Sequence, residues 1–485
     1  MMITALPNFS LIFPELSVLV MGCITLLSGL YLHGQAKQGV YWLAQLALFI
    51  AFVVTATLLV QNNFSLFGTK IFYDMVIIDK FGYVLKLAIY VITFGVFIYG
   101  RDYVYERGMS PGEYYSLSLF SMLGMMVLVS ANNLLTMFLA LELLSLPIYA
   151  LVAVLRDSTA CTEAAIKYFV MGALATGILL YGFSMLYGVT GSLDLGEIAY
   201  SIGHMPPEKN ALAMFGLVFA IVGMAFKLGI APFHMWVPDV YEGAPTSVTL
   251  FIATVPKLAV FGMLIRLLVG AMPSLSSHWQ ELLILLSILS IAIGNLIAVV
   301  QSNIRRLLGY SAIAHMGYMV LGVIAVTNTG YAAALFYIFT YVLTTLAIFG
   351  FVLIMGTRDQ EFELINGLRG LNQRNPWLAF LALVTLFALA GIPPVVGFMA
   401  KLGVLEALVN IHLISLAVFA MLFAVVGVYY YVRVIKVMYF EAPENTTPVT
   451  YSKGRGILLT VNCFAILALG FSPSALFQLC QSVFV

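Results

Sequence analysis

The run Phe226-Lys227-Leu228-Gly229-Ile230-Ala231-Pro232-Phe233-His234 stands inside an apolar stretch that covers residues 211–240. Proline removes a backbone donor and displaces a carbonyl, and glycine loosens the turn, so this run predicts a break in a helix. Backbone groups freed inside a membrane need water or protein partners. The stretch therefore predicts two half-helices joined by a short unwound segment, with a hydrated cavity beside Lys227.

A second break of the same kind lies in the apolar stretch 377–409. Residues 390–397 read AGIPPVVG, share the pattern Gly-Ile-x-Pro with the first break, and precede Lys401. Both stretches exceed the roughly 20 residues that a straight helix needs to cross a bilayer. Gly391 follows Gly229 by 162 residues, which indicates an internal repeat. The repeat is one of architecture, because Lys227 precedes its break whereas Lys401 follows its own.

The composition is that of a membrane protein. Of the 485 residues, 62% are hydrophobic and 9% are charged, with a mean hydropathy of +1.04, whereas soluble domains carry roughly 25% charged residues. A net charge of +1 excludes the basic surface that nucleic-acid binding requires. The sequence thus predicts an all-α membrane protein of about 14 transmembrane helices. The spans lie near 11–32, 40–60, 80–99, 114–130, 134–155, 163–187, 211–240, 246–269, 281–300, 305–325, 329–356, 377–409, 412–439 and 456–477.

The two breaks fall in spans 7 and 12, each within a block of five spans. Spans 4–8 form the first repeat and spans 9–13 the second. Because five is an odd number, the second repeat enters the membrane from the opposite face, an inverted arrangement common in transporters. The chain divides into a three-helix segment (1–110), a first five-helix repeat (111–270), a second five-helix repeat (271–440) and a C-terminal helix (441–485).

Basic residues concentrate in the odd-numbered loops, which predicts both termini on the outer side, since positive residues are retained in the cytoplasm. The odd-numbered loops carry thirteen: Lys37, Arg101, Arg107, Arg156, Arg305, Arg306, Arg358, Arg369, Arg374, Arg433, Lys436, Lys453 and Arg455. The even-numbered loops or their helix ends carry Lys70, Lys209 and Arg266.

Four charged residues lie deep inside predicted spans. Lys227, Lys257, Lys401 and Glu142 are each eight or more residues from either end of their spans. A charge at mid-bilayer costs about 2.5 to 3.5 kcal/mol on insertion scales, so these residues indicate function. A buried carboxylate and lysine keep each other ionised, and Lys227 is the predicted partner of Glu142. Moving the carboxylate away would then favour release of the lysine's proton.

The other basic residues within spans lie nearer the span ends. Lys167 sits about one turn into its span and follows Glu163, so an interfacial role and a functional one both stay open. Lys80 and Lys86 fall in the first two turns of their span beside Asp79, where long side chains can reach the interface.

Two histidines are candidates for relaying protons, because imidazole takes and gives a proton near neutral pH. His315 is mid-span between the lysines of the two repeats, and His234 lies just past the first break. For each, a satisfied polar group is the alternative reading. The others lie at loop or span edges and carry no functional expectation: His33, His204, His278 and His412.

No metal or cofactor is expected in this chain. Its cysteines stand alone, without the close pairing that zinc, haem or iron–sulfur ligation requires. No glycine-rich phosphate loop or nucleophile elbow is present. The cysteines are Cys23, Cys161, Cys463 and Cys480.

Several motifs resemble those of the antiporter-like subunits of respiratory complex I, in the family's order and over essentially the whole chain. They are LELLSLP (141–147), FK (226–227) followed by HMWVPDVYEGAP (234–245), Lys257, RRLLGYS (305–311) and GIPP (391–394). The family has three paralogous subunits. Lys401 stands where the first carries glutamate, and the chain lacks the long lateral helix of the second. The run ATVPK (253–257) has the form found in the third. These features favour the third paralogue.

The resemblance implies that Glu142 pairs with Lys227 and that Lys257 and His315 continue a central hydrophilic axis. It places Lys401 toward the proton exit and Lys167 near the input side. It also implies a subunit of the enzyme NADH:quinone oxidoreductase, without redox chemistry of its own, in a bacterial plasma (inner) membrane.

Partner subunits are then expected to hold FMN, iron–sulfur clusters and quinone. The expected partners are other antiporter-like and small membrane subunits and the lipid bilayer. Two alternatives remain: a stand-alone cation:proton antiporter and a purely structural membrane subunit.

Overall fold

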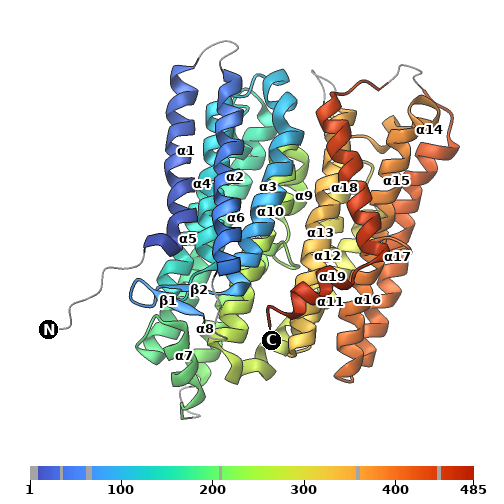
Figure 1. Ribbon diagram of the computed structural model, residues 1–485. Coiled ribbons are helices and arrows are strands. Elements are labelled where there is room, and N and C mark those ends of the chain that lie inside the picture. The colour runs from blue at the N-terminus through green and yellow to red at the C-terminus, as the bar shows by residue number, and fades with distance from the viewer. Residues whose placement is uncertain are drawn as a thin grey trace.

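The computed structural model is a bundle of long helices that run roughly side by side (Figure 1). It describes residues 9–32, 37–61, 68–206, 210–356, 361–444 and 449–484; His33, Lys209 and Arg358, named from the sequence, lie outside these ranges. The longer helices are α1 Phe13–Tyr31, α2 Gln38–Gln61, α3 Lys80–Glu106, α4 Pro111–Val129, α5 Leu134–Val152, α6 Thr159–Thr190, α8 Asn210–Leu228, α10 Thr246–Leu264, α11 Ser276–Val300, α12 Ile304–Ile324, α13 Asn328–Met355, α15 Pro376–Ala390, α16 Val396–Asn410, α17 Ile414–Phe440 and α18 Lys453–Phe471. Short elements are β1 Thr69–Ile71, β2 Val76–Ile78, α7 Leu195–Gly203, α9 Trp236–Gly243, α14 Leu371–Arg374 and α19 Ser474–Gln481.

Within the described ranges, 13 helices are long and apolar enough to cross a membrane. The pair α15 and α16 supplies one further crossing as two shorter helices. The prediction of an all-α membrane protein with about 14 spans is therefore confirmed.

The first predicted break is present between α8 and α9. Gly229 follows the last residue of α8 and has φ of 75°, in the left-handed region that favours glycine. The indole N–H of Trp236 donates to the carbonyl of Phe226 at 2.8 Å, and the N–H of Ala231 donates to Ser290 Oγ at 2.9 Å. Side chains thus satisfy backbone groups that the break frees, as a membrane interior requires.

The second predicted break separates α15 from α16. Gly391 ends α15 with φ of 77°, again in the left-handed region. Gly397, in the first turn of α16, approaches the other half-helix so closely that an added Cβ would lie 1.8 Å from the carbonyl oxygen of Ala388. Both halves are therefore packed against each other across the unwound segment.

The N-termini of α5 and α12 have the same kind of cap and the same kind of β-bridge. Asn133 caps α5 and Asn303 caps α12, each accepting a backbone N–H at 2.9 Å from two residues further on. Asn133 also forms a β-bridge with Asp194, and Asn303 forms one with Leu364; both members of the second pair follow those of the first by 170 residues. Asp194 precedes α7 and Leu364 precedes α14, and these helices lie at opposite ends of the bundle (Figure 1). This recurrence supports the inverted repeat.

Helix α10 lies at the centre of the packing. Every one of its residues is buried, and it packs against α3, α4 and α13. Pro256 and Lys257 fall inside this helix. Lys257 is therefore surrounded by protein on all sides.

Some short elements were not predicted. Strands β1 and β2 form an antiparallel hairpin, and α7 is a short helix whose Asp194 cap accepts two backbone N–H groups. The last predicted span, 456–477, was too long: α18 ends at Phe471 and a separate α19 begins at Ser474. Pro473 explains the stop, because a residue before proline is disfavoured in helical conformation.

The interfacial position predicted for Lys86 is wrong. Lys86 is fully buried, and its Nζ lies 2.6 Å from Oε1 of Glu15 on α1. Helix α1 covers this part of α3 and supplies the counter-charge, which the sequence near Lys86 does not reveal. Lys80 does reach the surface, as predicted. Asp79, expected beside these lysines, instead pairs with Arg266 at 2.8 Å.

Candidate functional site

Lys227 lies in the last turn of α8, immediately before the first break. Its ammonium group is buried and donates to Ser145 Oγ at 2.7 Å and to Tyr149 Oη at 3.2 Å, both on α5. Ser145 and Tyr149 follow Glu142 by three and seven residues, a spacing that places all three on one helix face. Two neutral hydroxyls therefore hold the lysine beside an acidic residue.

The predicted direct pair between Glu142 and Lys227 is not formed. Glu142 is half-buried, and in the part of the chain that is described no ion pair within 4.0 Å joins it to a basic group. The two residues interact electrostatically, so they are neighbours without contact. Ser145, one turn along α5, takes the position nearest the ammonium group.

Lys257 projects from the centre of α10 toward α13. Its Nζ donates to Tyr341 Oη at 3.0 Å. The residue as a whole is 3% exposed. The same ammonium group lies 4.8 Å from the centre of the Tyr341 ring, a distance at which cation–π attraction adds to the hydrogen bond. Within the described residues, Tyr341 thus supplies the hydrogen bond of this lysine.

His315 on α12 lies among three tyrosines. Its Nδ1 is 2.8 Å from Tyr337 Oη, its Nε2 is 3.3 Å from Tyr431 Oη, and its ring packs 5.3 Å from the ring of Tyr341. Tyr431 Oη also shares a hydrogen bond with Ser311 Oγ. His315 interacts electrostatically with both Lys257 and Lys401. His315 therefore lies next to Tyr341, the tyrosine that accepts from Lys257, and its role between Lys257 and Lys401 stays a prediction.

Lys401 lies next to the second break. Its Nζ donates to the carbonyl of Ala390 at 2.8 Å and to that of Leu389 at 3.3 Å. These carbonyls belong to the last turn of α15, where helix geometry leaves acceptors unpaired and gathers negative partial charge. The ammonium group also lies 5.3 Å from the ring centre of Tyr318. The break thus creates the acceptors that hold this lysine.

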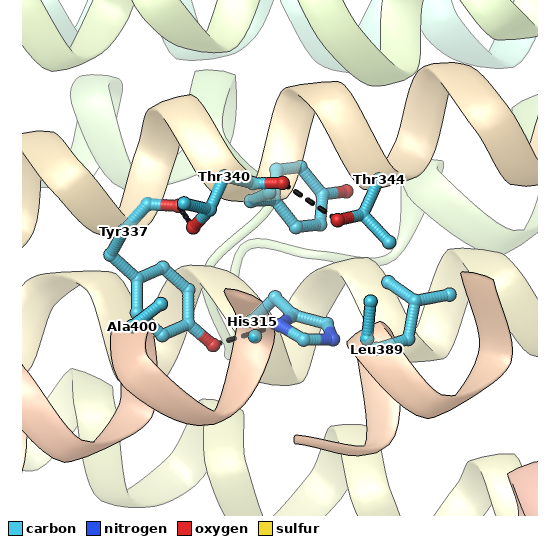
Figure 2. Close-up of a pocket in the computed structure, with 9 residues that line it drawn as sticks. His315, Tyr337, Thr340, Thr344, Leu389 and Ala400 are labelled. Atoms are coloured by element: carbon cyan, nitrogen blue, oxygen red, sulfur yellow. Dashed lines mark hydrogen bonds between the residues drawn. The ribbon is translucent and has the colours of Figure 1, made fainter. Parts of the chain in front are cut away.

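A small cavity connects His315 with the second break (Figure 2). Its volume of about 10 Å³ is close to the space that one water molecule needs. Figure 2 shows Thr340 and Thr344 on α13, opposite His315, and Leu389 beside the histidine ring; both threonine hydroxyls donate to backbone carbonyls of α13. No lysine among the described residues lines this cavity, so the hydrated cavity predicted beside Lys227 stays a prediction.

A larger cavity of about 580 Å³, here called the charged cavity, lies where α6, α9 and the start of α12 meet. Its charged lining residues are Arg107, Glu163, Lys167, Asp239, Glu242, Arg305, Arg306, Glu361 and Glu363. Lys167 pairs with Glu163 at 2.8 Å and with Asp239 at 3.1 Å, and Arg306 pairs with Asp239 at 2.9 Å. Lys167 is therefore a half-exposed residue of this cavity, and none of its described contacts reaches Lys227 or Lys257.

His234 lies in the first break, as predicted, but its described contacts do not include a lysine. Its side chain is half-buried, and Nδ1 is buried without a hydrogen-bond partner. His204, His278 and His412 are exposed, in agreement with their predicted positions at the edges of spans.

The hydroxyl groups of the site were missed by the sequence reasoning, which considered charged residues and histidines. The missed residues are Ser145, Tyr149, Ser311, Tyr318, Tyr337, Tyr341 and Tyr431. One signal could have found part of this set: residues 337, 340, 341 and 344 of α13 are Tyr, Thr, Tyr and Thr, a polar stripe at helical spacing in an apolar span.

We use the name buried axis for Lys227, Lys257, His315 and Lys401 with the hydroxyls that contact them. It extends from α5 and α8 in the first half of the chain, through α10, to α12, α13 and α16 in the second half.

The chain is similar to known membrane proteins over nearly its full length. Residues 131–429 match the family model described as NADH:quinone oxidoreductase/Mrp antiporter, TM. NADH-quinone oxidoreductase subunit N of Coxiella burnetii is 52% identical over 480 residues, covering 99% of both chains. The protein of the same name from Nitrosomonas europaea is 46% identical over 480 residues, covering 98% of both chains.

Solved structures agree with these relatives. A chain of respiratory complex I from Thermus thermophilus with bound aureothin has a TM-score of 0.80 at 33% identity and covers 96% of this chain and 99% of its own. A chain of the Mrp complex from Dietzia sp. DQ12-45-1b shares the fold, with a TM-score of 0.84 at 18% identity and coverage of 98% and 96%. The chain therefore belongs to the NADH-quinone oxidoreductase subunit N family of antiporter-like membrane proteins.

Proposed function

We propose that this chain is a proton-translocating membrane subunit of a bacterial NADH:quinone oxidoreductase, and that protons move along its buried axis. The observation that carries this proposal is the way the three lysines are held. Each ammonium group is buried, and the hydrogen bonds described for it go to hydroxyl or carbonyl oxygens: those of Ser145 and Tyr149, of Tyr341, and of Leu389 and Ala390.

Such surroundings suit a lysine that must change its charge. When a buried ion pair loses one charge, the other is left uncompensated, at a cost of about 3 to 5 kcal/mol. A lysine held by neutral oxygens leaves no unpaired charge behind when its proton departs. Tyrosine and serine hydroxyls can also both donate and accept a proton, so they support either protonation state.

Glu142 is then the controlling group rather than a permanent partner. It lies on the face of α5 that carries Ser145 and Tyr149, and it interacts with Lys227 without contact. A shift of α5 that brings the carboxylate closer stabilises the charged lysine, and a shift away favours release of its proton. Energy for this shift comes from quinone reduction in other subunits.

The ends of the path follow from the charged cavity and from Lys401. The charged cavity opens at the end of the bundle to which the basic loops assign the cytoplasmic side, and its carboxylates suit the collection of protons. Lys401, at the second break, is the last lysine before the outer side. Both termini face that outer side in this arrangement.

Every group in this scheme donates or accepts a proton, and none transfers electrons. FMN, iron–sulfur clusters and quinone accordingly belong to partner subunits, and the chain carries no redox chemistry of its own. Its neighbours are antiporter-like and small membrane subunits of the same complex and the lipids of the plasma membrane.

The test uses the assembled complex in sealed vesicles, with Lys227→Ala and Glu142→Ala measured for protons pumped per NADH oxidised. Both variants are expected to lower this ratio, whereas the surface variant Lys80→Ala keeps it. Unchanged pumping in both axis variants, with normal assembly, would remove the proposed switch. Co-purification with flavin- and iron–sulfur-bearing subunits excludes a stand-alone antiporter, and retained coupling after replacement of Lys257 and Lys401 would favour a purely structural role.

A further inference from the structure

The buried axis contains one interval that the described hydrogen bonds do not span. The contacts of Lys227 end at Ser145 and Tyr149 on α5, and those of Lys257 end at Tyr341 on α13. A proton cannot pass between these two sites through apolar side chains. A group that can both accept and donate is needed between them.

Tyr241 on α9 has the properties that this interval requires. It is 0% exposed, and its hydroxyl is buried without a hydrogen-bond partner in the described structure. Buried polar atoms are nearly always hydrogen-bonded, and each exception calls for an explanation such as water or a functional role. The proton path described above does not use Tyr241.

Ring contacts lead from Tyr149 on α5 through Tyr168 and Trp236 to Tyr241 on α9. Tyr149, which holds Lys227, packs edge-on against Tyr168 on α6 with ring centres 4.8 Å apart. Tyr168 stacks on Trp236 at 4.6 Å, and Trp236 lies 6.5 Å from the ring of Tyr241.

A further ring contact of Tyr241 leads toward Lys257. Tyr241 packs against Trp236, which stacks on Tyr168. Its ring also packs 5.9 Å from Phe349, on the helix that carries Tyr341. The ring of Tyr241 therefore connects the aromatic contacts that lead to Tyr149, beside Lys227, with α13, the helix whose Tyr341 holds Lys257.

We propose that the hydroxyl of Tyr241 relays protons between the Lys227 site and the Lys257 site, with water bridging the distances to its neighbours. The inference rests on the proposed function of the buried axis. In each passage the phenolic oxygen accepts one proton from the Lys227 side and releases its own proton toward Tyr341, so the tyrosine stays neutral and unchanged. Water carries hydrogen bonds nearly as well as a direct contact.

The deciding variant is Tyr241→Phe in the assembled complex, because phenylalanine keeps the ring contacts and removes only the hydroxyl. We expect the initial rate of proton pumping to fall by up to about fivefold, the factor that corresponds to one net hydrogen bond. The slowed passage should also show a larger solvent deuterium isotope effect than the wild type, which a change in packing alone does not produce.

Tyr115→Phe is the matched control. Tyr115 is also 0% exposed and its hydroxyl also lacks a partner, but its ring packs against Tyr41 and Tyr114 at the α2–α4 contact, away from the lysines. This variant should pump as the wild type does. If Tyr241→Phe pumps as well as Tyr115→Phe, the relay role is overturned.

Two further variants keep the outcome decisive. Tyr241→His restores a group that accepts and donates, so it should recover part of the pumping lost in Tyr241→Phe; equal loss in both variants would indicate a packing defect and overturn the relay.

Lys257→Met separates this inference from the proposed function. If Lys257→Met stops pumping and Tyr241→Phe does not, only the relay fails, whereas normal pumping in Lys257→Met removes the buried axis itself.

Discussion

The ammonium group of Lys257 lies 3.0 Å from the hydroxyl of Tyr341, a residue 84 positions further along the chain. This contact joins α10, in the first half of the chain, to α13, in the second half. A proton on Lys257 is therefore in direct contact with both halves of the molecule. Lys257 and Tyr341 lie on helices that are distant in the sequence. Their contact therefore depends on how α10 packs against α13.

Tyr341→Phe should uncouple the two halves of the path. The change removes the hydroxyl that accepts from Lys257 and leaves a buried ammonium group without a hydrogen bond, a loss of about 1.5 to 3 kcal/mol for a bond to a charged group. The initial rate of proton pumping should fall by up to about tenfold, because about 1.4 kcal/mol corresponds to a factor of ten. Tyr90→Phe, which removes a buried hydroxyl near Thr55, should leave pumping unchanged; a similar loss in both variants would contradict the prediction.

Ser145→Ala should weaken control at Lys227. The variant removes the shorter of the two hydrogen bonds that hold the ammonium group, at 2.7 Å, and keeps the bond to Tyr149. With one acceptor left, we expect a partial loss of pumping, on the order of five- to tenfold. Ser118→Ala on α4 removes a hydroxyl that bonds only to its own helix. Pumping assays in vesicles compare the two, and full activity of Ser145→Ala would mean that Tyr149 alone is sufficient.

Gly391→Ala should displace Lys401. Gly391 has φ of 77°, and a Cβ there would lie 2.8 Å from Cδ and 3.1 Å from Nζ of Lys401. The left-handed conformation adds roughly 1 to 2 kcal/mol of strain for a residue with a side chain. We expect pumping to be nearly lost while the complex still assembles. Gly188→Ala, at a position where an added Cβ meets open space, should behave as the wild type, and pumping by Gly391→Ala at that level would refute the role of the break in holding Lys401.

The buried pair of Glu15 and Lys86 should matter for stability and not for pumping. Its atoms lie 2.6 Å apart, and Lys86 is fully buried. Lys86→Met should destabilise the N-terminal segment by about 3 to 5 kcal/mol, because the carboxylate is left without its counter-charge. The double variant Glu15→Gln with Lys86→Met should recover much of that loss. Thermal unfolding of the purified complex measures the cycle, and a double variant no more stable than Lys86→Met would argue against the pair.

The breaks and the buried lysines could be predicted because their signals are local. Glycine and proline interrupt a helix wherever they occur together, and a lysine in an apolar run is conspicuous at once. Gly229 and Gly391 both adopt the left-handed conformation that their surroundings in the sequence indicate. Fold class and the positions of the axis lysines follow from such local rules.

The partners of those lysines depend on packing between distant segments and could not be predicted in the same way. Tyr431 is one of 26 tyrosines, and the sequence does not connect it with His315; the polar stripe on α13 indicates Tyr341 but not its partner Lys257. The direct pair of Glu142 and Lys227 was predicted from charge alone, but Ser145 is the nearer neighbour. Lys86 was misplaced for a related reason, since Glu15 approaches it from 71 residues away.

The enclosure of α10 has a consequence for chemical inhibition. Each of its residues, Lys257 included, is covered by neighbouring helices, so a hydrophobic blocker dissolved among the lipid tails has no surface of this helix to attach to. A compound aimed at Lys257 must instead approach through one of the aqueous ends, where it has to be small and polar enough to follow the route that hydrated protons take.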